Sequence, residues 1–343
     1  MGMSREVLWG LVADATVVEP LLLSVYEEEL KKDWKEEDKS PHGQSWHTSF
    51  HASAFPGDDD SVCGRAQVYG LMNPAPEKPF EPWLKSWFDL GRNLEHDWVR
   101  RLSAAGVLLS ADVTGEDEFQ TGLSVPEIWL TGSPDLIILP PFYKKAHVIE
   151  VKTTSHEKVL NMQTEPANVP YSHAKYLRQI KTYIAIAHEK FAPTVMICRR
   201  SGTLIKTDKC GRMHKRDCDP VILAVIPPDD GTLIYSSREE PLKTASYYVP
   251  YDPEHMKAGI PKLEAWRDYF IKDEIPPHVR EGESTKWSEG ECKFCDWKKP
   301  FCKTDYKNKT KKLTESALVS HTKKIRKNYD PIKTRNAVLE RWR

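Results

Sequence analysis

Two short apolar runs on either side of a proline-containing turn constrain the fold of this 343-residue chain more than any other feature. The stretch from residue 132 to residue 152 reads GSPDLIILPPFYKKAHVIEVK, with aliphatic runs at 136–139 and 146–151 and the turn between them. Runs of this length around such a turn are typical of an antiparallel hairpin. We therefore predict a hairpin whose strands pair symmetrically about the middle of the turn.

This register brings two acidic residues opposite each other. Asp135 lies seven residues before Phe142 and Glu150 lies seven residues after Tyr143, and side chains that pair directly have Cβ atoms roughly 5 Å apart. Because side chains alternate along a strand, Lys152 shares a face with Glu150. Two carboxylates at one place repel each other unless a proton or a cation lies between them, and an oxygen-only ligand set suits Mg²⁺ or Mn²⁺. The pattern predicts metal-assisted hydrolysis of a phosphodiester.

A simpler interpretation of the same residues is open at this point. Asp135 could cap the turn, while Glu150 and Lys152 could be ordinary solvent-facing residues of an edge strand. An Asp followed by Glu-x-Lys is a short and common pattern. The catalytic interpretation therefore depends on what the rest of the chain adds.

Two predicted helices could add residues to this site. The segment 83–102 has apolar residues at helical spacing, and Glu95 falls about 40° from the centre of that apolar stripe whereas His96 falls about 140° away. An inward carboxylate needs a partner, which could be a metal ion or a nearby arginine. A later helix places Gln179 and Tyr183 one turn apart. They could hydrogen-bond a phosphate or a water, or could simply lie at the edge of the core.

The remaining pattern predicts an α/β fold with a mixed central sheet and flanking helices. A loop is expected from Thr153 to Pro170. Strands are expected at 107–113, 128–130, 194–198, 203–206, 221–226 and 246–250, and helices at 17–32, 175–190 and 253–271.

Three cysteines close together predict a metal or cluster site. Cys292, Cys295 and Cys302 lie within eleven residues, and two thiols separated by two residues reach one metal ion without strain. A closed site needs four ligands, and Cys63, next to Arg65, is the best remaining candidate. Such a site would join the region near residue 63 to the region near residue 300. The spacing suits zinc and an iron–sulfur cluster equally, and a chance pair of reduced thiols is the alternative.

Composition predicts a globular, soluble and cytoplasmic protein. Hydrophobic residues make up 39% of the chain and charged residues 29%, and no apolar run approaches the roughly 20 residues of a membrane span. The opening MGMSREVLWG lacks the basic and apolar regions of a signal peptide. Basic and acidic residues balance at 50 each, but residues 303–343 contain 13 Lys or Arg against 4 Asp or Glu. This basic extension could follow a phosphate backbone or could be a solvated tail.

The order of these motifs along the chain resembles that of a known group of nucleases. The group is the PD-(D/E)xK nucleases of the RecB-like branch that bear an iron–sulfur cluster, including CRISPR-associated iron–sulfur exonucleases, their phage-encoded relatives and the AddB nuclease domain. The resemblance spans about residues 60 to 302 and implies a restriction-endonuclease-like core clasped by a cysteine cluster. The matching residues are Cys63, Gly91-x3-Glu95, Gly132-Ser-Pro-Asp135, Glu150-Val-Lys152, Gln179-x3-Tyr183 and Cys292-x2-Cys295-x6-Cys302.

The resemblance implies a role for each matching residue. Lys152 would orient or activate the attacking water, and Gln179 with Tyr183 would position the scissile strand. The implied ligands of Mg²⁺ or Mn²⁺ are Glu95, Asp135, Glu150 and the Val151 carbonyl, and those of a [4Fe–4S] cluster are Cys63, Cys292, Cys295 and Cys302. Many members of the group carry His where the spacing here gives Glu95, and His96 is one residue off. The extension beyond Cys302 matches nothing in the group.

These implications amount to a metal-dependent DNA exonuclease that acts on single strands or strand ends, in recombination or repair, with no membrane partner. The alternatives are a non-catalytic nucleic-acid-binding module with a zinc-type cysteine site, and an endonuclease on the same core. The expected organisation is an N-terminal helical and loop region (1–60), a nuclease core (61–272), a linker with the cysteine element (273–302) and the basic extension (303–343).

Overall fold

The computed structural model describes residues 49–57, 62–72, 82–111, 122–165, 174–206, 209–210, 218–240, 243–272, 274 and 276. The chain divides into two compact units, one of residues 1–45 and 77–90 and the other of residues 46–76 and 91–343. Of the first unit, the described part is the beginning of helix α5 (Pro82–Ala105). The helix expected at 17–32 and the three C-terminal cysteines lie outside the described residues.

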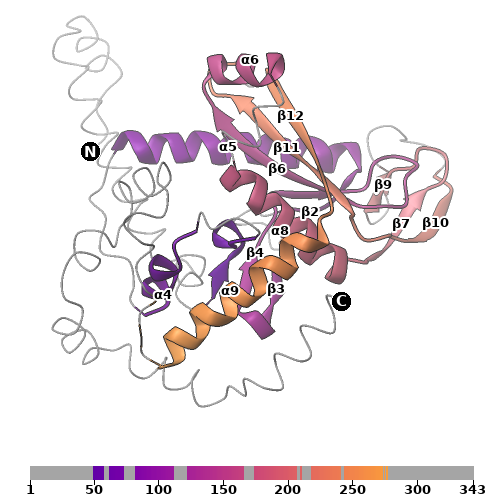
Figure 1. Cartoon of the computed structure of the whole chain (residues 1–343). Coiled ribbons are helices and arrows are strands. Elements are labelled where there is room, and N and C mark those ends of the chain that lie inside the picture. The colour runs from indigo at the N-terminus through magenta and orange to yellow at the C-terminus, as the bar shows by residue number, and fades with distance from the viewer. Residues whose placement is uncertain are drawn as a thin grey trace, which may run out of the picture. The chain divides into compact units, whose positions relative to one another are not determined.

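A mixed five-stranded sheet forms the centre of the second unit, in the order β12-β11-β6-β5-β2 (Figure 1). β6 pairs antiparallel with β5 on one side and parallel with β11 on the other, and the outer strands β2 and β12 are antiparallel to their neighbours. The strands are β2 (Leu108–Ala111), β5 (Leu136–Ile138), β6 (His147–Thr154), β11 (Asp230–Ser237) and β12 (Thr244–Pro250).

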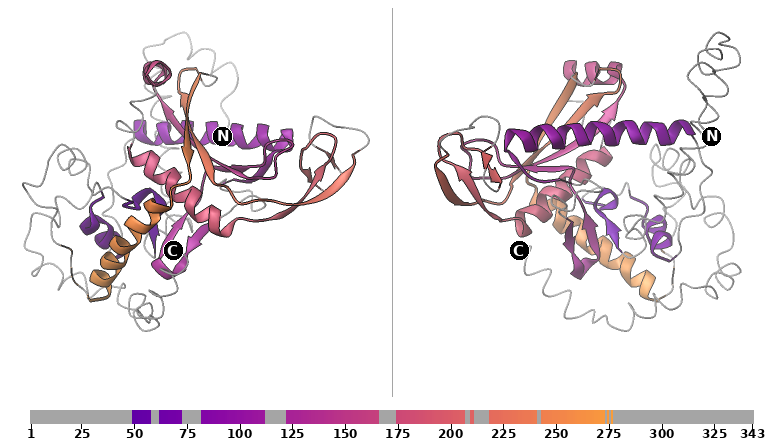
Figure 2. Two further views of the ribbon diagram at one scale, coloured as in Figure 1. Left: turned by 45° about the vertical axis from the view of Figure 1, so that its right-hand side comes forward. Right: turned by 180° about the vertical axis from the view of Figure 1, so that it is seen from behind.

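Helices cover both faces of this sheet, as the two views of Figure 2 show. Helix α8 (Ala174–Lys190) packs on one face through Ile180 and Ile184, which join Val148 and Leu233 in the main core. The second half of α5 covers the other face, where Val99 packs in a second cluster with residues of β2, β5, β6 and β11. A mixed sheet between helices confirms the predicted α/β class.

Central strand β6 is buried on both faces because each face meets a helix layer. Val148, Glu150 and Lys152 point to the side of α8, and Ile149 and Val151 belong to the cluster under α5. A strand between two helix layers is expected to be almost continuously apolar. The charged Glu150 and Lys152 depart from that expectation.

A smaller layer lies beside the main sheet and contains the first described residues. It consists of a three-stranded sheet of β1 (Phe50–His51), β4 (Leu130–Gly132) and β3 (Leu123–Val125), with the short 3₁₀ helices η1 (Ala52–Ala54) and η2 (Pro126–Ile128). Helix α4 (Gly64–Met72) packs along α9 (Pro253–Lys272), and any side chain on Gly64 would collide with the indole of Trp266. The region near Cys63 is thereby attached to the last described helix.

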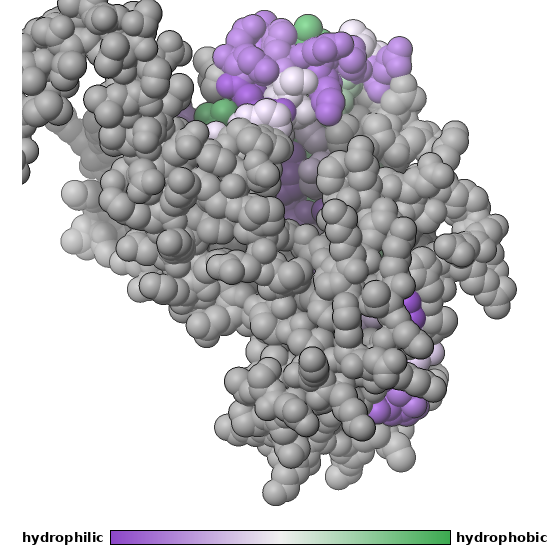
Figure 3. Space-filling model, turned by 90° about the vertical axis from the view of Figure 1, so that its left-hand side faces the viewer, coloured by the Kyte–Doolittle hydropathy of each residue, from purple (hydrophilic) through white to green (hydrophobic). Residues whose placement is uncertain are grey.

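A two-stranded ribbon of β7 (Thr194–Cys198) and β10 (Pro220–Ala224) extends from the main sheet, with the short pair β8 (Ile205–Lys206) and β9 (Lys209–Cys210) near it (Figures 1 and 2). At another end of the sheet, helix α6 (His156–Thr164) presents mostly hydrophilic side chains (Figure 3). In the described part of the chain, no helix combines the length and the hydropathy that crossing a bilayer requires.

Two secondary-structure predictions differ from the structure, and one strand of the central sheet was not predicted. The loop expected from Thr153 to Pro170 is wrong, because β6 continues to Thr154 and α6 follows, with Val159 and Met162 buried one turn apart. The strand expected at 128–130 is wrong at its start, since a 3₁₀ turn ends at Ile128. The residue after that turn, Trp129, has a φ of 56°, which is left-handed. The central strand β11 was not predicted at all.

Candidate active site

The hairpin at the centre of the sequence has the predicted register. Leu136 pairs with Ile149 and Ile138 pairs with His147. One position beyond Leu136, the same register places Asp135 opposite Glu150. The connecting turn contains Phe142 with a φ of 66°. Two carboxylates from adjacent strands therefore meet at one end of the β5–β6 pair.

Asp135 is fixed to the neighbouring strand by a backbone hydrogen bond. The amide N–H of Val151 donates to Oδ2 of Asp135 over 2.6 Å. The side chain is half-buried. Because the bond comes from the residue after Glu150, it holds the Asp135 carboxylate beside that of Glu150.

Glu150 is fully buried, and its two carboxylate oxygens have different environments. Oε1 lies 2.5 Å from Nζ of Lys152, whereas Oε2 accepts no hydrogen bond from any described residue. A buried polar atom without a partner costs about 1–3 kcal/mol, and more when it is charged. An unsatisfied carboxylate oxygen beside a second carboxylate has the chemistry of a hard-cation ligand.

The mutual environment of these groups changes their pKa values. Burial, followed by the charge of Asp135, raises the pKa of Glu150 to about 8, although Lys152 opposes the change. Burial also raises the pKa of Asp135. Burial alone would lower the pKa of Lys152, but the charges of Glu150 and Asp135 raise it above its usual value. The charge of Lys152 is therefore retained, and the two carboxyl groups together favour a shared proton or a bound cation.

Gln179 and Tyr183 lie at the same site on helix α8. Nε2 of Gln179 donates to the Tyr183 hydroxyl over 3.0 Å, and both side chains are buried. Burial, then the charge of Glu150, raises the pKa of Tyr183 well above its usual value. A Cβ on Gly132 would come within 2.6 Å of the Tyr183 ring, so the ring occupies space that the glycine leaves open. The two residues are thus part of the buried site and not an exposed Gln beside a core-edge Tyr.

Glu95 approaches the carboxylate pair from helix α5, while His96 is exposed. The charge of Glu95 contributes to raising the pKa of Glu150, which places the two groups within electrostatic range. One turn earlier, a Cβ on Gly91 would lie 3.5 Å from Oγ1 of Thr153, so the helix passes close to β6. Among the described side chains, no three His, Cys, Asp or Glu residues form a metal-ligand group. Glu95 is therefore near the pair without completing a three-residue group.

Two tyrosines that sequence reasoning missed border Lys152. Nζ of Lys152 lies over the ring of Tyr176, 5.5 Å from its centroid. The ring of Tyr176 meets that of Tyr235 edge-on, with centroids 6.4 Å apart. Tyr176 precedes Gln179 by three residues, a helical spacing that could have indicated it. Tyr235 lies on β11, and because that strand was not predicted, nothing in the sequence indicated that Tyr235 lies near Lys152.

Cys63 is half-buried immediately before α4, and its three expected partners lie outside the described residues. Nε of Arg65 donates to the carbonyl of Pro276 over 2.9 Å. The chain at residue 276 therefore runs beside the Cys63 region, sixteen residues before Cys292. The Val151 carbonyl stays a prediction as a metal ligand.

Comparisons with known proteins gave matches among solved structures alone. No protein-family model and no curated protein matches the chain. A crystal structure of an alkaline exonuclease, LHK-Exo from Laribacter hongkongensis, is similar with a TM-score of 0.41 and 11% identity, covering 67% of this chain and 91% of that chain. The structure of LHK-Exo in complex with dAMP gives a TM-score of 0.40 and 11% identity, covering 67% of this chain and 93% of that chain.

Proposed function

We propose that this chain is a metal-dependent DNA exonuclease of the iron–sulfur, RecB-like PD-(D/E)xK kind that hydrolyses phosphodiester bonds in single strands or at strand ends. The observation that carries the proposal is the pairing of Asp135 with Glu150 across the hairpin. One buried oxygen of Glu150 has no hydrogen-bond donor among the described residues, and Lys152 contacts the other. A cation and a phosphate are the partners that such a site accepts.

The residues present suit Mg²⁺ or Mn²⁺. Asp135 and Glu150 would hold the ion, and Glu95 and the Val151 carbonyl would be further ligands. When bound, the ion eases deprotonation of the attacking water and neutralises negative charge that develops on the phosphate. A carboxylate pair with raised pKa values gains most from such an ion, because the ion removes the repulsion between the two charges.

The remaining side chains would orient the substrate and the water. Lys152 stays charged and would stabilise negative charge on a phosphate oxygen or orient the attacking water. Because Gln179 donates to the oxygen of Tyr183, the hydroxyl hydrogen of Tyr183 is available for an acceptor. Its raised pKa keeps that hydrogen in place. Tyr183 would therefore donate to a phosphate oxygen of the scissile strand.

The cysteine part of the proposal is a structural [4Fe–4S] cluster held by Cys63, Cys292, Cys295 and Cys302. The contact between Arg65 and Pro276 supports it, because it holds the last described residue, sixteen positions before Cys292, against a residue close to Cys63 in the sequence. Anaerobic purification should give a brown protein with iron and sulfide, and Cys63→Ala should lose both. If the protein is instead colourless and contains zinc, the four cysteines hold a zinc ion and not a cluster.

Cleavage of end-labelled single-stranded DNA with Mn²⁺ or Mg²⁺ tests the catalytic part. The unmodified protein and Glu254→Gln, an exposed control on α9, should degrade the strand, whereas Glu150→Gln should not. A circular single strand should stay intact, because an exonuclease needs a free end. Cleavage of the circle would show that the activity is that of an endonuclease. If all three proteins bind DNA and none of them cleaves it, the chain is a nucleic-acid-binding module and not a nuclease.

A further inference from the structure

The Lys152 ammonium group has two kinds of neighbour. Glu150 contacts it as a carboxylate at 2.5 Å, and Tyr176 contacts it through the face of its ring at 5.5 Å. Tyr235 stands next to Lys152 in the parallel register of β6 and β11 and is almost fully buried. The edge-on contact between the two tyrosine rings, with planes 64° apart, links α8 to this strand pair.

A lysine side chain needs more than one contact to keep its ammonium group in one position. Its flexible stem loses up to about 2 kcal/mol of rotamer freedom when it is fixed. The ion pair with Glu150 constrains the distance to one oxygen but leaves the stem free to rotate around it. A ring face attracts a cation through the ring quadrupole, by about 1 kcal/mol at a partly exposed site.

Of the two aromatic residues, Tyr235 is the more deeply buried. It belongs to the main core, whereas Tyr176 is only partly buried and packs against that core. Tyr235 can therefore fix the orientation of the Tyr176 ring, and the ring can fix the ammonium group. The attraction uses the π system of Tyr176, so a phenylalanine in its place would serve equally well.

We propose that Tyr176 is a positioning residue that holds the Lys152 ammonium beside the carboxylate pair through its ring face, and that Tyr235 sets the orientation of that ring. The effect on catalysis rests on the proposed nuclease function. The contact itself does not rest on it. Tyr176 therefore extends the Gln179-x3-Tyr183 pattern by one residue at the preceding turn of α8.

Kinetics of strand cleavage test the catalytic consequence. Tyr176→Leu should lower kcat about fivefold, the equivalent of about 1 kcal/mol, with KM unchanged, and Tyr176→Phe should restore it. Tyr143→Leu is the matched control, since Tyr143 is exposed in the hairpin turn before β6, and it should leave kcat unchanged. The proposal is overturned if Phe is as harmful as Leu, or if Tyr176→Leu raises KM and leaves kcat intact, as a substrate contact would.

Urea unfolding of a double-mutant cycle tests the contact without using activity. Tyr176→Leu and Lys152→Gln should be coupled by about fivefold in the unfolding equilibrium constant. Additive effects would overturn the proposed contact, and coupling without any change of kcat would overturn the positioning role. If coupling is present but Glu150→Gln cuts DNA normally, the proposed catalytic site fails while the contact stands. If Glu150→Gln is inactive and the effects are additive, the positioning inference alone fails.

Discussion

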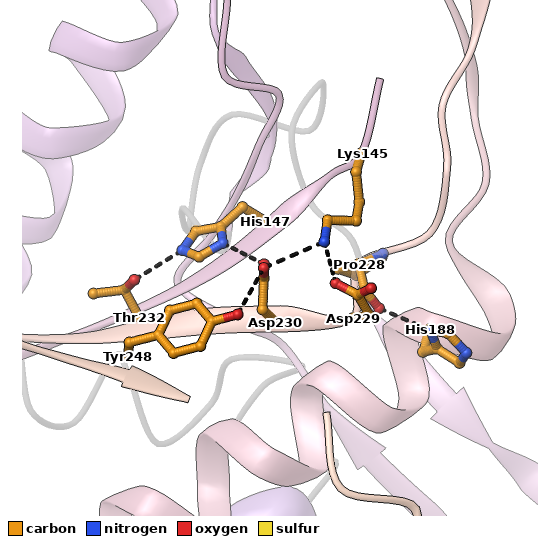
Figure 4. Close-up of polar contacts among 8 residues, drawn as sticks. All are labelled: Lys145, His147, His188, Pro228, Asp229, Asp230, Thr232 and Tyr248. Carbon is orange, nitrogen blue, oxygen red and sulfur yellow. Dashed lines mark hydrogen bonds and ion pairs between the residues drawn. The ribbon is translucent and has the colours of Figure 1, made fainter. Parts of the chain in front are cut away.

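Two ionic clusters include residues of strand β6, and the clusters differ in how completely their charges are satisfied. The second cluster lies where β6 and β11 begin (Figure 4) and consists of Lys145, His147, Asp229, Asp230, Thr232 and Tyr248. His147 bonds Asp230 through Nδ1 at 2.6 Å and Thr232 through Nε2 at 2.8 Å. The Tyr248 hydroxyl donates to Oδ2 of Asp230 at 3.1 Å. Each oxygen of Asp230 therefore has a partner.

The pKa values of the two clusters differ in the same way. Burial alone would raise the pKa of Asp230, but the hydrogen bond from His147 and the charge of Lys145 bring it below its usual value. Glu150 lies in a deeper site, where burial and a second carboxylate prevail and raise the pKa. A satisfied cluster stabilises a fold, whereas an unsatisfied one of raised pKa is a candidate for binding and catalysis. We assign the first role to the Asp230 cluster and the second to the Asp135–Glu150 pair.

The largest expected effect is on activity, where Asp135 of the catalytic pair should differ from Asp230 of the second cluster. Asp135→Asn should lower the rate of DNA cleavage on the order of 100-fold or more, because it removes a ligand of the cation and its charge. Asp230→Asn makes the same chemical change on β11, which is separated from β5 by β6, and should leave the rate within about twofold. Single-turnover cleavage of end-labelled DNA measures both. Equal losses in the two variants would end the functional distinction between the clusters.

For the free energy of unfolding, Asp230 should matter more than Asp135. Asp230→Asn should lower the free energy of unfolding by about 1–3 kcal/mol, because it weakens charge-assisted bonds to His147 and Lys145 in a partly buried place. Urea denaturation at pH 7 measures it. A variant as stable as the unmodified protein would show that the cluster does not stabilise the fold.

The pH dependence of stability should come from the catalytic pair. Folded-state pKa values of Glu150 and Asp135 are raised, so the folded protein holds more protons than the unfolded chain. Without metal, stability is therefore fully present below about pH 4.5 and is lost as the pH rises toward about 8, by an amount on the order of 5 kcal/mol. Glu150→Gln should flatten this slope, as measured by urea midpoints across the range. A slope that survives the substitution would assign it to other groups.

The smallest effect is expected at the exposed edge of the second cluster. Asp229 pairs with Lys145, but both side chains are substantially exposed. Asp229→Asn should change the free energy of unfolding by no more than about 0.5 kcal/mol, since exposed ion pairs contribute little. Thermal unfolding beside Asp230→Asn makes the comparison. A loss as large as that of Asp230→Asn would mean that the cluster acts as one network.

The carboxylate pair was predictable because its determinants are local. Asp135 and Glu150 are fifteen residues apart and belong to one hairpin, so alternation and turn length alone set their pairing. The helical positions of Gln179 and Tyr183 followed from the apolar stripe of α8 in the same way. The side of the sheet that α8 covers is a property of the whole fold, and it decided that both residues are buried.

The elements that were not predicted are rich in polar residues, so their sequences do not indicate that they are buried. β11 has only Leu233, Ile234 and Tyr235 as an apolar run, and its last two residues, Ser236 and Ser237, are fully buried. Without β11, neither the neighbour of Lys152 nor the second ionic cluster could be anticipated. Helix α6 was missed for a similar reason, because only Val159 and Met162 of its nine residues are buried.

Binding of Mn²⁺ tests the central claim most directly, because it requires no assumption about the substrate. Calorimetric titration at pH 8 should show binding to the unmodified protein and to Asp230→Asn, and a loss of about tenfold or more in affinity for Asp135→Asn and Glu150→Gln. Affinity should fall toward pH 6, since the ion must displace the proton of Glu150. Equal binding by all four proteins would contradict the assignment of the Asp135–Glu150 pair as the metal site.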